Sequence, residues 1–168
     1  MTPLVQHSER NPFHISVGAV VVNSEGNIMV HTLSADSVPK DIADVLGGLD
    51  TAYILMRESV EDNESLEEAV LRGIQEEFGV EGTIRRYLGS TQSVLPARYG
   101  DFEKTTLYFE VTFSSQAERV VHDWESTTLL EWHDPEFLIT KMKEQGQATS
   151  RGDLDESKII ETYLAYAG

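Results

Sequence analysis

The stretch that decides the fold is Glu64-Ser-Leu-Glu-Glu-Ala-Val-Leu-Arg-Gly-Ile-Gln-Glu-Glu-Phe-Gly-Val80, which predicts a short amphipathic helix. At about 100° per residue its large apolar side chains form one stripe: Leu66, Val70, Ile74 and Phe78. Glu77 falls at about 20° on this helical wheel, inside the stripe, whereas Glu76 lies to one side. One carboxylate of the pair therefore turns toward the apolar side of the helix.

An inward carboxylate needs a partner, because a lone ionised acid in an apolar setting is costly. A hard cation with oxygen ligands, Mg²⁺ or Mn²⁺, is the natural candidate beside Glu77. Arg72 lies four residues after Glu68 and four before Glu76, so it is placed to hold both carboxylates and to orient Glu76. The alternative is a solvated helix with ordinary acidic and basic pairing.

Both ends of this helix are marked in the sequence. Ser65 followed by Glu68 forms a capping box, in which each side chain bonds the other residue's backbone amide. Gly79 supplies the left-handed residue that ends a helix. The predicted helix therefore runs from about Leu66 to Phe78.

The same stretch resembles the Nudix box, which reads Gly, five residues, Glu, seven residues, Arg-Glu, an aliphatic residue, any residue, Glu-Glu, any residue, Gly and an aliphatic residue. The spacing is kept without a gap, and the matching residues are Glu64, Arg72, Glu76, Glu77, Gly79 and Val80. Two positions depart from the box: Glu58 stands at its first Gly, and Gly73 stands at the Glu after Arg.

The resemblance implies a hydrolase of nucleoside diphosphates linked to another moiety, which uses water and Mg²⁺ or Mn²⁺. Carried over by position, Glu76 and Glu77 look like the principal metal ligands, and Glu64 looks like an outer ligand. Arg72 looks like the residue that orients them. Glu125 is similar in placement to the late acidic residue that some members use as a ligand or base.

The missing Glu at position 73 is commonly a metal ligand or the catalytic base in the family. Two accounts of Gly73 stay open: a neighbouring backbone or ligand approaches the helix there, or the position relaxed after catalysis was lost. Glu58 offers a replacement carboxylate, directed toward Glu76 and Glu77, and Arg57 beside it would bind phosphate oxygens. The alternative is a surface ion pair between Arg57 and Glu58.

Composition limits the other choices. The 168 residues predict one domain with its own core, and the absence of cysteine excludes disulfides and thiolate metal sites. Residues 1–12 are expected to form a loose arm, without a signal core, and the sequence has no membrane-spanning run, so a cytoplasmic location is the default. The net charge of -16 argues against a nucleic-acid polymer as partner, although a bound cation would still admit a small phosphorylated ligand.

The remaining pattern predicts an α/β chain in which a mixed central sheet lies between helices, in agreement with the α/β/α sandwich that the resemblance implies. Residues 34–51 are expected to be a loop or broken helix over the substrate site. Arg98 and Tyr99 lie on a loop that would grip phosphate and stack a base, or else would be a turn whose aromatics cap the core. Predicted strands are Ile15–Val22, Ile28–Leu33, Tyr53–Met56, Thr83–Val94, Thr105–Phe113 and Thr127–Trp132, followed by helices Pro135–Glu144 and Leu154–Ala167.

Four of the five histidines, at positions 14, 31, 122 and 133, have no zinc-site spacing, and we expect none of these four to be catalytic. Two functional hypotheses follow. The first is a metal-dependent Nudix-type pyrophosphohydrolase, and the second is an inactive Nudix-like module that binds a nucleotide or a protein. A homodimer is expected from base rates alone.

Overall fold

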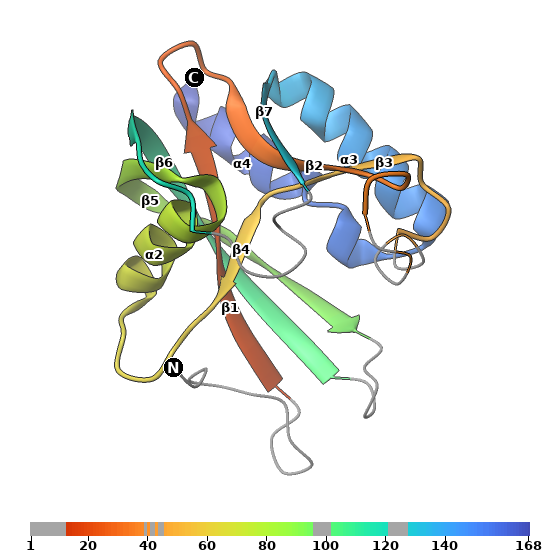
Figure 1. Cartoon of the computed structure of the whole chain (residues 1–168), viewed down its shortest axis with the longest axis horizontal. Helices are drawn as coiled ribbons and strands as arrows, with labels where there is room; N and C mark the ends of the chain where they lie inside the picture. The colour runs from red at the N-terminus through yellow and green to blue at the C-terminus, as the bar shows by residue number, and fades with distance from the viewer. Residues whose placement is uncertain (1–12, 39, 41–42, 44–45, 96–101, 121–127) are drawn as a thin grey trace.

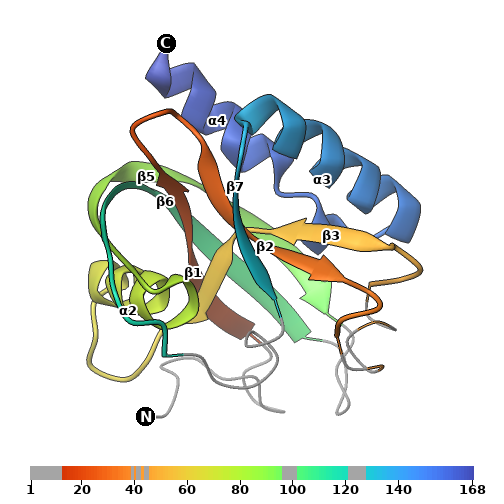
Figure 2. The same ribbon diagram turned by 45° about the horizontal axis from the view of Figure 1, so that its top comes forward.

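The computed structural model describes residues 13–38, 40, 43, 46–95, 102–120 and 128–168. In this part of the chain, one mixed sheet is flanked by helices, with α2 on one side and α3 and α4 on the other (Figures 1 and 2). The prediction of an α/β sandwich with a mixed sheet is confirmed.

The described sheet contains seven strands in the order β3-β2-β1-β6-β5, with β4 paired to β1 and β7 paired to β2. Only the β1–β6 pair among them is parallel. β1 leaves β2 after the hairpin and pairs with β4, so the sheet divides between β1 and β2. The strands are β1 (Phe13–Val22), β2 (Ile28–Ser34), β3 (Thr51–Ile54), β4 (Met56–Ser59), β5 (Val80–Leu95), β6 (Phe102–Gln116) and β7 (Leu129–His133).

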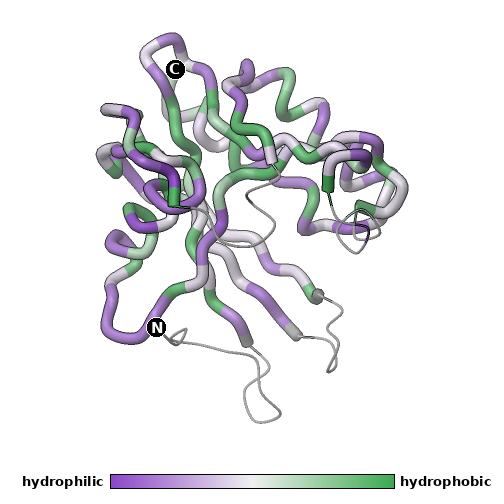
Figure 3. The backbone as a smooth tube through the Cα atoms, in the orientation of Figure 1, coloured by the Kyte–Doolittle hydropathy of each residue, from purple (hydrophilic) through white to green (hydrophobic). Residues whose placement is uncertain are grey.

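Two apolar clusters occupy the two faces of the sheet. Helix α2 (Leu66–Phe78) packs Val70, Ile74 and Phe78 onto one face, with odd-numbered residues of β1 and β6. Helices α3 (Pro135–Thr149) and α4 (Ser157–Ala167) cover the other face. Figure 3 shows that hydrophobic residues recur along the central strands, while the segment before α2 is hydrophilic.

The predicted ends of the first helix are confirmed. Ser65 Oγ accepts a hydrogen bond from the Glu68 amide at 3.2 Å, and Glu68 Oε2 accepts one from the Ser65 amide at 2.7 Å. Gly79 follows in the left-handed conformation, with φ of 62°. Local capping bonds are therefore present at both ends of α2.

The predicted end of the next helix at Glu144 is wrong, since α3 continues to Thr149. Gln145 explains the extension: its amide bonds both backbone groups of Tyr53, at 2.7 and 3.0 Å, and is buried against β3. Gly146 permits close packing, because a Cβ there would lie 2.7 Å from Cβ of Asp155. The residues from Gln145 to Thr149 therefore form a packed last turn of α3.

Two other predicted boundaries also shift. The single strand expected at Tyr53–Met56 is two strands, β3 and β4, which pair with different neighbours on either side of Leu55. The last helix begins at Ser157, after a 3₁₀ turn over Gly152–Leu154 (η2). Among the helices described, none is long and apolar enough to cross a bilayer.

The segment between β2 and β3, expected to cover a substrate site, is described only in part. Leu46 packs in a small cluster with Leu33, Ala52 and Leu154. This cluster anchors the segment to the edge of the sheet. Its role as a cover stays a prediction.

Replacing Ser65 with Ala should lower the free energy of unfolding by about 1 kcal/mol, because the cap to the Glu68 amide is lost. Chemical denaturation would measure the change. Glu67→Gln is the control, because Glu67 lies in the same turn but takes no part in the capping box, and it should lower the free energy of unfolding by less. Equal stability of Ser65→Ala and the unmodified protein would contradict a contribution from the cap.

Candidate active site

Arg72 on α2 is the centre of one group of carboxylates. Its Nε and Nη2 donate to the two oxygens of Glu64 at 3.1 and 2.7 Å, and Nη2 also donates to the Ser59 carbonyl at 2.8 Å. Its Nη1 lies 3.4 Å from Oε2 of Glu58 and 3.4 Å from Oε2 of Glu76. The predicted contact of Arg72 with Glu76 is confirmed, whereas Glu68, its other predicted partner, instead accepts the Ser65 amide. The same guanidinium also contacts Glu58 and Glu64.

Glu64 is fully engaged in this arrangement. Besides Arg72, its Oε1 accepts the Glu61 amide at 2.6 Å. The hydrogen bond from Arg72 is the main reason that the pKa of Glu64 lies below its ordinary value. Glu64 therefore acts in this structure as an anchor for Arg72.

Gly73 lies at a close contact between α2 and β4. A Cβ at this position would stand 2.8 Å from Cβ of Glu58, 2.8 Å from Sδ of Met56 and 3.0 Å from its Cε. The Glu58 atom belongs to a strand and has little freedom to move. Of the two accounts of Gly73, close approach of a neighbouring chain segment is the one that this geometry supports.

Glu77 lies inside the apolar stripe of α2, as predicted, and is 8% exposed. Its Oε2 is 2.8 Å from Nε2 of His31 on β2. His31 Nδ1 in turn lies 2.8 Å from Oγ1 of Thr128. The partner that a buried acid requires is therefore a histidine in this structure.

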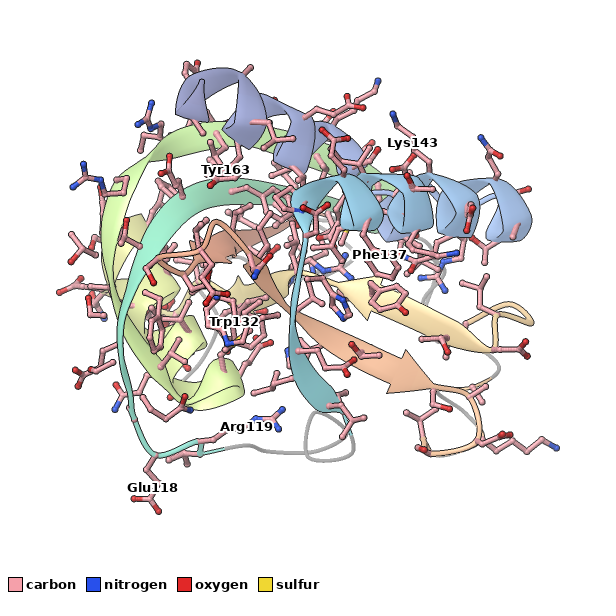
Figure 4. All side chains as sticks on the ribbon, turned by 90° about the horizontal axis from the view of Figure 1, so that it is seen from above. Glu118, Arg119, Trp132, Phe137, Lys143 and Tyr163 are labelled. Atoms are coloured by element: carbon pink, nitrogen blue, oxygen red, sulfur yellow. The ribbon has the colours of Figure 1, made fainter. Side chains whose placement is uncertain are left out.

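Arg119 lies in the segment that follows β6, where Figure 4 labels it, and contacts the last turn of α2. Its Nε donates to the backbone carbonyl of Glu77 at 2.5 Å, and Nη2 donates to Oγ1 of Thr128 at 3.2 Å. Gly79 leaves room for this contact, because a Cβ there would be 2.7 Å from Cβ of Arg119. The last turn of α2 is thus held from two directions.

Two carboxylates of the site resist ionisation. Burial, followed by the charge of Glu58, raises the pKa of Glu77 to about 8. Burial also raises the pKa of Glu58, with Arg72 opposing the change and Glu76 adding to it. The charge of Glu58 therefore opposes ionisation of Glu77, as one like charge opposes another.

Two cations act on the same region. Arg57 Nε is 3.6 Å from Oε1 of the buried Glu156, and Nη1 donates to the Asp153 carbonyl at 3.2 Å. Burial, followed by the charge of Arg57, lowers the pKa of Lys104 to about 8. Both cations contribute to the electrostatics of Glu77. Arg57 and Glu58 turn to different partners, so the surface ion pair between them, the alternative interpretation, is absent from this structure.

The donor set suits a hard divalent cation, although the side chains are not arranged around one. Within the described ranges, no group of three or more His, Asp or Glu side chains is placed to hold a metal ion. Glu58, Glu76 and Glu77 nevertheless offer only oxygen donors, which Mg²⁺ and Mn²⁺ prefer. A cation there would relieve the repulsion between Glu58 and Glu77, after Glu58 turns from Arg72 and Glu77 turns from His31.

Three residues singled out by sequence, Glu125, Arg98 and Tyr99, lie outside the described residues. Two residues that act on Glu77, His31 and Lys104, were not predicted from the sequence as part of the site. His31 was expected to have no catalytic role. The His31 and Glu77 pair is separated by 46 residues, and no local spacing signals such a contact. The sequence next to Lys104 predicted a strand, but it did not predict which residues lie near Lys104 in space.

A family model described as NUDIX domain matches residues 12–151. The chain belongs to the Nudix family. Comparison with curated protein sequences gives no match. Solved structures similar to this Nudix chain include the solution structure of the E. coli ORF135 protein, with a TM-score of 0.61 and 19% identity over 93% of this chain and 91% of that chain. A NUDIX hydrolase from Nitrosomonas europaea has a TM-score of 0.63 and 17% identity over 91% and 89% of the two chains.

At these identities, the similarity to the two structures shows the Nudix fold alone. Nudix hydrolases generally use divalent metal cations. The family and the fold are therefore common to this chain and its neighbours, whereas the roles of its departures at Glu58 and Gly73 have to be argued from its own geometry.

Stability of the protein in chelator should fall as the pH rises from about 5 to about 8, in part because of Glu77. Its pKa is raised from 4.5 to about 8, so the folded state binds this proton more tightly than the unfolded chain does, and stability is lost as the proton leaves. Glu77→Gln removes this titration. The difference in unfolding free energy between the variant and the unmodified protein should grow in favour of the variant over that interval. Parallel curves, measured by denaturation at a series of pH values, would contradict the raised pKa.

Proposed function

We propose that this Nudix protein is a divalent-metal-dependent hydrolase of a phosphoanhydride bond in a nucleoside diphosphate linked to another moiety. The observation that carries the proposal is the group of carboxylates, Glu58, Glu64 and Glu76, around Arg72 of the helix that also carries the buried Glu77. The charges of Glu58, Arg57 and Lys104 all act on Glu77. Carboxylates that suit a metal cation therefore lie within the electrostatic influence of two positive side chains that suit a phosphate.

We assign the carboxylates by their exposure and contacts. Glu58 and Glu77 are the proposed principal ligands of Mg²⁺ or Mn²⁺. Glu76, whose side chain is 39% exposed and held by Arg72, is accessible to water and is proposed to contribute a further oxygen or accept a proton. Glu64 keeps Arg72 in place. When bound, the cation would neutralise phosphate oxygens and acidify the attacking water.

The reaction needs one water molecule. Its oxygen forms a bond to phosphorus, and the bridging P–O bond breaks with its electron pair leaving on the departing phosphate. The proton released by the water passes to a carboxylate, for which Glu76 is the proposed acceptor. Glu125 is an additional candidate from the sequence.

Arg57 and Lys104 are proposed to bind the phosphate groups of the substrate. Each stands close enough to the other to oppose its charge, as the lowered pKa of Lys104 reflects, and an anion between them would remove this repulsion. Arg98 and Tyr99 are proposed to add contacts to phosphate and base. The cytoplasmic location and the homodimer stay predictions.

The hydrolase proposal is tested by a substrate screen. Nucleoside diphosphate sugars, dinucleoside polyphosphates and nucleoside triphosphates would be incubated with Mg²⁺ or Mn²⁺, and the products separated by chromatography. We expect turnover of at least one class, its loss in Glu77→Gln, and its retention in Glu67→Gln, which changes an exposed acid on the same helix. Turnover that is unaffected by Glu77→Gln would contradict the assignment.

Lys104→Gln should raise KM by roughly tenfold, with a smaller effect on kcat, if Lys104 binds substrate phosphate as strongly before as during the reaction. Lys143→Gln is the matched control, because Lys143 is exposed on α3 and pairs with Glu161 of α4 at 2.5 Å, away from the site (Figure 4). Steady-state kinetics on the substrate found in the screen would measure both. An unchanged KM for Lys104→Gln would exclude this role.

A second candidate is an inactive Nudix module that binds a nucleotide or a protein. The specific observation in its favour is that Glu77 is already paired with His31, while no three described acidic or histidine residues form a ready metal site. This candidate predicts that a nucleotide raises the unfolding temperature without any product being formed. The substrate screen, read together with thermal unfolding, separates it from the hydrolase.

A further inference from the structure

The two departures from the Nudix box are neighbours in space. Glu58 on β4 and Gly73 on α2 are fifteen positions apart, yet a Cβ on Gly73 would be 2.8 Å from Cβ of Glu58. One position has gained a Glu where the box has Gly, and the other has Gly where the box has Glu. The contact means that the two changes concern the same small volume.

We infer that Glu58 and Gly73 form a reciprocal exchange, in which the carboxylate beside Glu77 is supplied from β4 instead of α2. Residues 73 and 77 are one helical turn apart, so a side chain on residue 73 would lie next to Glu77. Glu58 fills that place from the opposite side. This inference rests on the proposed function, because it assigns one ligand of the same site.

The surroundings of Glu58 agree with this role. Its Oε2 lies 3.4 Å from Nη1 of Arg72, which is also 3.4 Å from Oε2 of Glu76. Its charge is the largest contribution, after burial, to the electrostatics of Glu77. Glu58 therefore shares the Arg72 guanidinium with Glu76, and its charge acts on Glu77.

The contact does not leave room for side chains at both position 58 and position 73. With Glu58 in place, any side chain at residue 73 meets a strand Cβ, so both carboxylates cannot be present without separating α2 from β4. Gly73 differs in this respect from Gly152, where an added Cβ would meet nothing within 4 Å. Removing Cβ of Glu58 would leave mainly Met56, whose side chain is flexible, in the way.

Four variants test the exchange: Glu58→Gly, Gly73→Glu, the double variant Glu58→Gly/Gly73→Glu, and its control Glu58→Ala/Gly73→Glu. The control removes the Glu58 carboxylate but keeps the clashing Cβ. Mn²⁺ affinity would be measured by titration calorimetry, and the unfolding temperature would be measured in chelator.

In chelator, Gly73→Glu should lower the unfolding temperature by roughly 5 °C or more, because it overpacks the contact between α2 and β4. The Glu58→Gly double variant should recover most of this loss, and the Glu58→Ala control should not. Mn²⁺ should bind Glu58→Gly at least about tenfold more weakly than the unmodified protein. The Glu58→Gly double variant should regain most of that affinity.

Equal Mn²⁺ affinity of Glu58→Gly and the unmodified protein would overturn the exchange and the assignment of Glu58 as a ligand, whereas hydrolysis itself is decided separately by the substrate screen. Failure of the Glu58→Gly double variant to bind Mn²⁺ more tightly than Glu58→Gly would also overturn it. Absence of Mn²⁺ binding by the unmodified protein would overturn both proposals together. Equal unfolding temperatures of the two double variants would remove the steric basis of the exchange.

Discussion

Helix α2 lies so close to strand β4 that residue 73 has no space for a side chain, and the arrangement of the site depends on this contact. Cβ of Glu58 stands where a side chain of residue 73 would otherwise be. The contact sets the distance from β4 to the face of α2 that carries Glu77. It thereby brings acids from a strand and a helix into one neighbourhood, although the box places its acids mainly on the helix.

The mutual repulsion of these carboxylates has to be offset, and two residues of the chain, Arg72 and His31, do so. Arg72 neutralises one group, since a single guanidinium contacts Glu58, Glu64 and Glu76. Glu77 is instead buried against His31, and its raised pKa records the cost of ionising it there. Each of these acids thus has a protein partner in this structure, and the proposed metal binding would exchange the partners of Glu58 and Glu77 for the ion.

Local sequence patterns predicted the elements that are specified locally. The helix at Leu66–Phe78, its capping box and its Gly79 stop follow from spacing over a few residues, and the structure confirms them. The end of α3 could not be predicted in this way, because the buried amide of Gln145 is satisfied by Tyr53, 92 residues away in the sequence. The division of one expected strand into β3 and β4 likewise depends on pairing with two different strands.

The residues of the candidate site also fall into those that local spacing predicted and those that it did not. Spacing alone identified Arg72, Glu76 and the inward turn of Glu77, which all belong to one helix. His31 and Lys104 were missed because β-sheet pairing, and not local spacing, brings them to the site. The sequence alone could not decide between the two explanations of Gly73, because the deciding observation is its contact with Glu58 on β4.

The most direct test of the central claim is the position of Mn²⁺ in a crystal of the unmodified protein, located by anomalous scattering. The account predicts a peak bonded to carboxylate oxygens of both Glu58 and Glu77, with the His31 contact of Glu77 broken. A peak that is bonded to Glu77 without Glu58, or no peak beside α2 in crystals soaked with Mn²⁺, would contradict it.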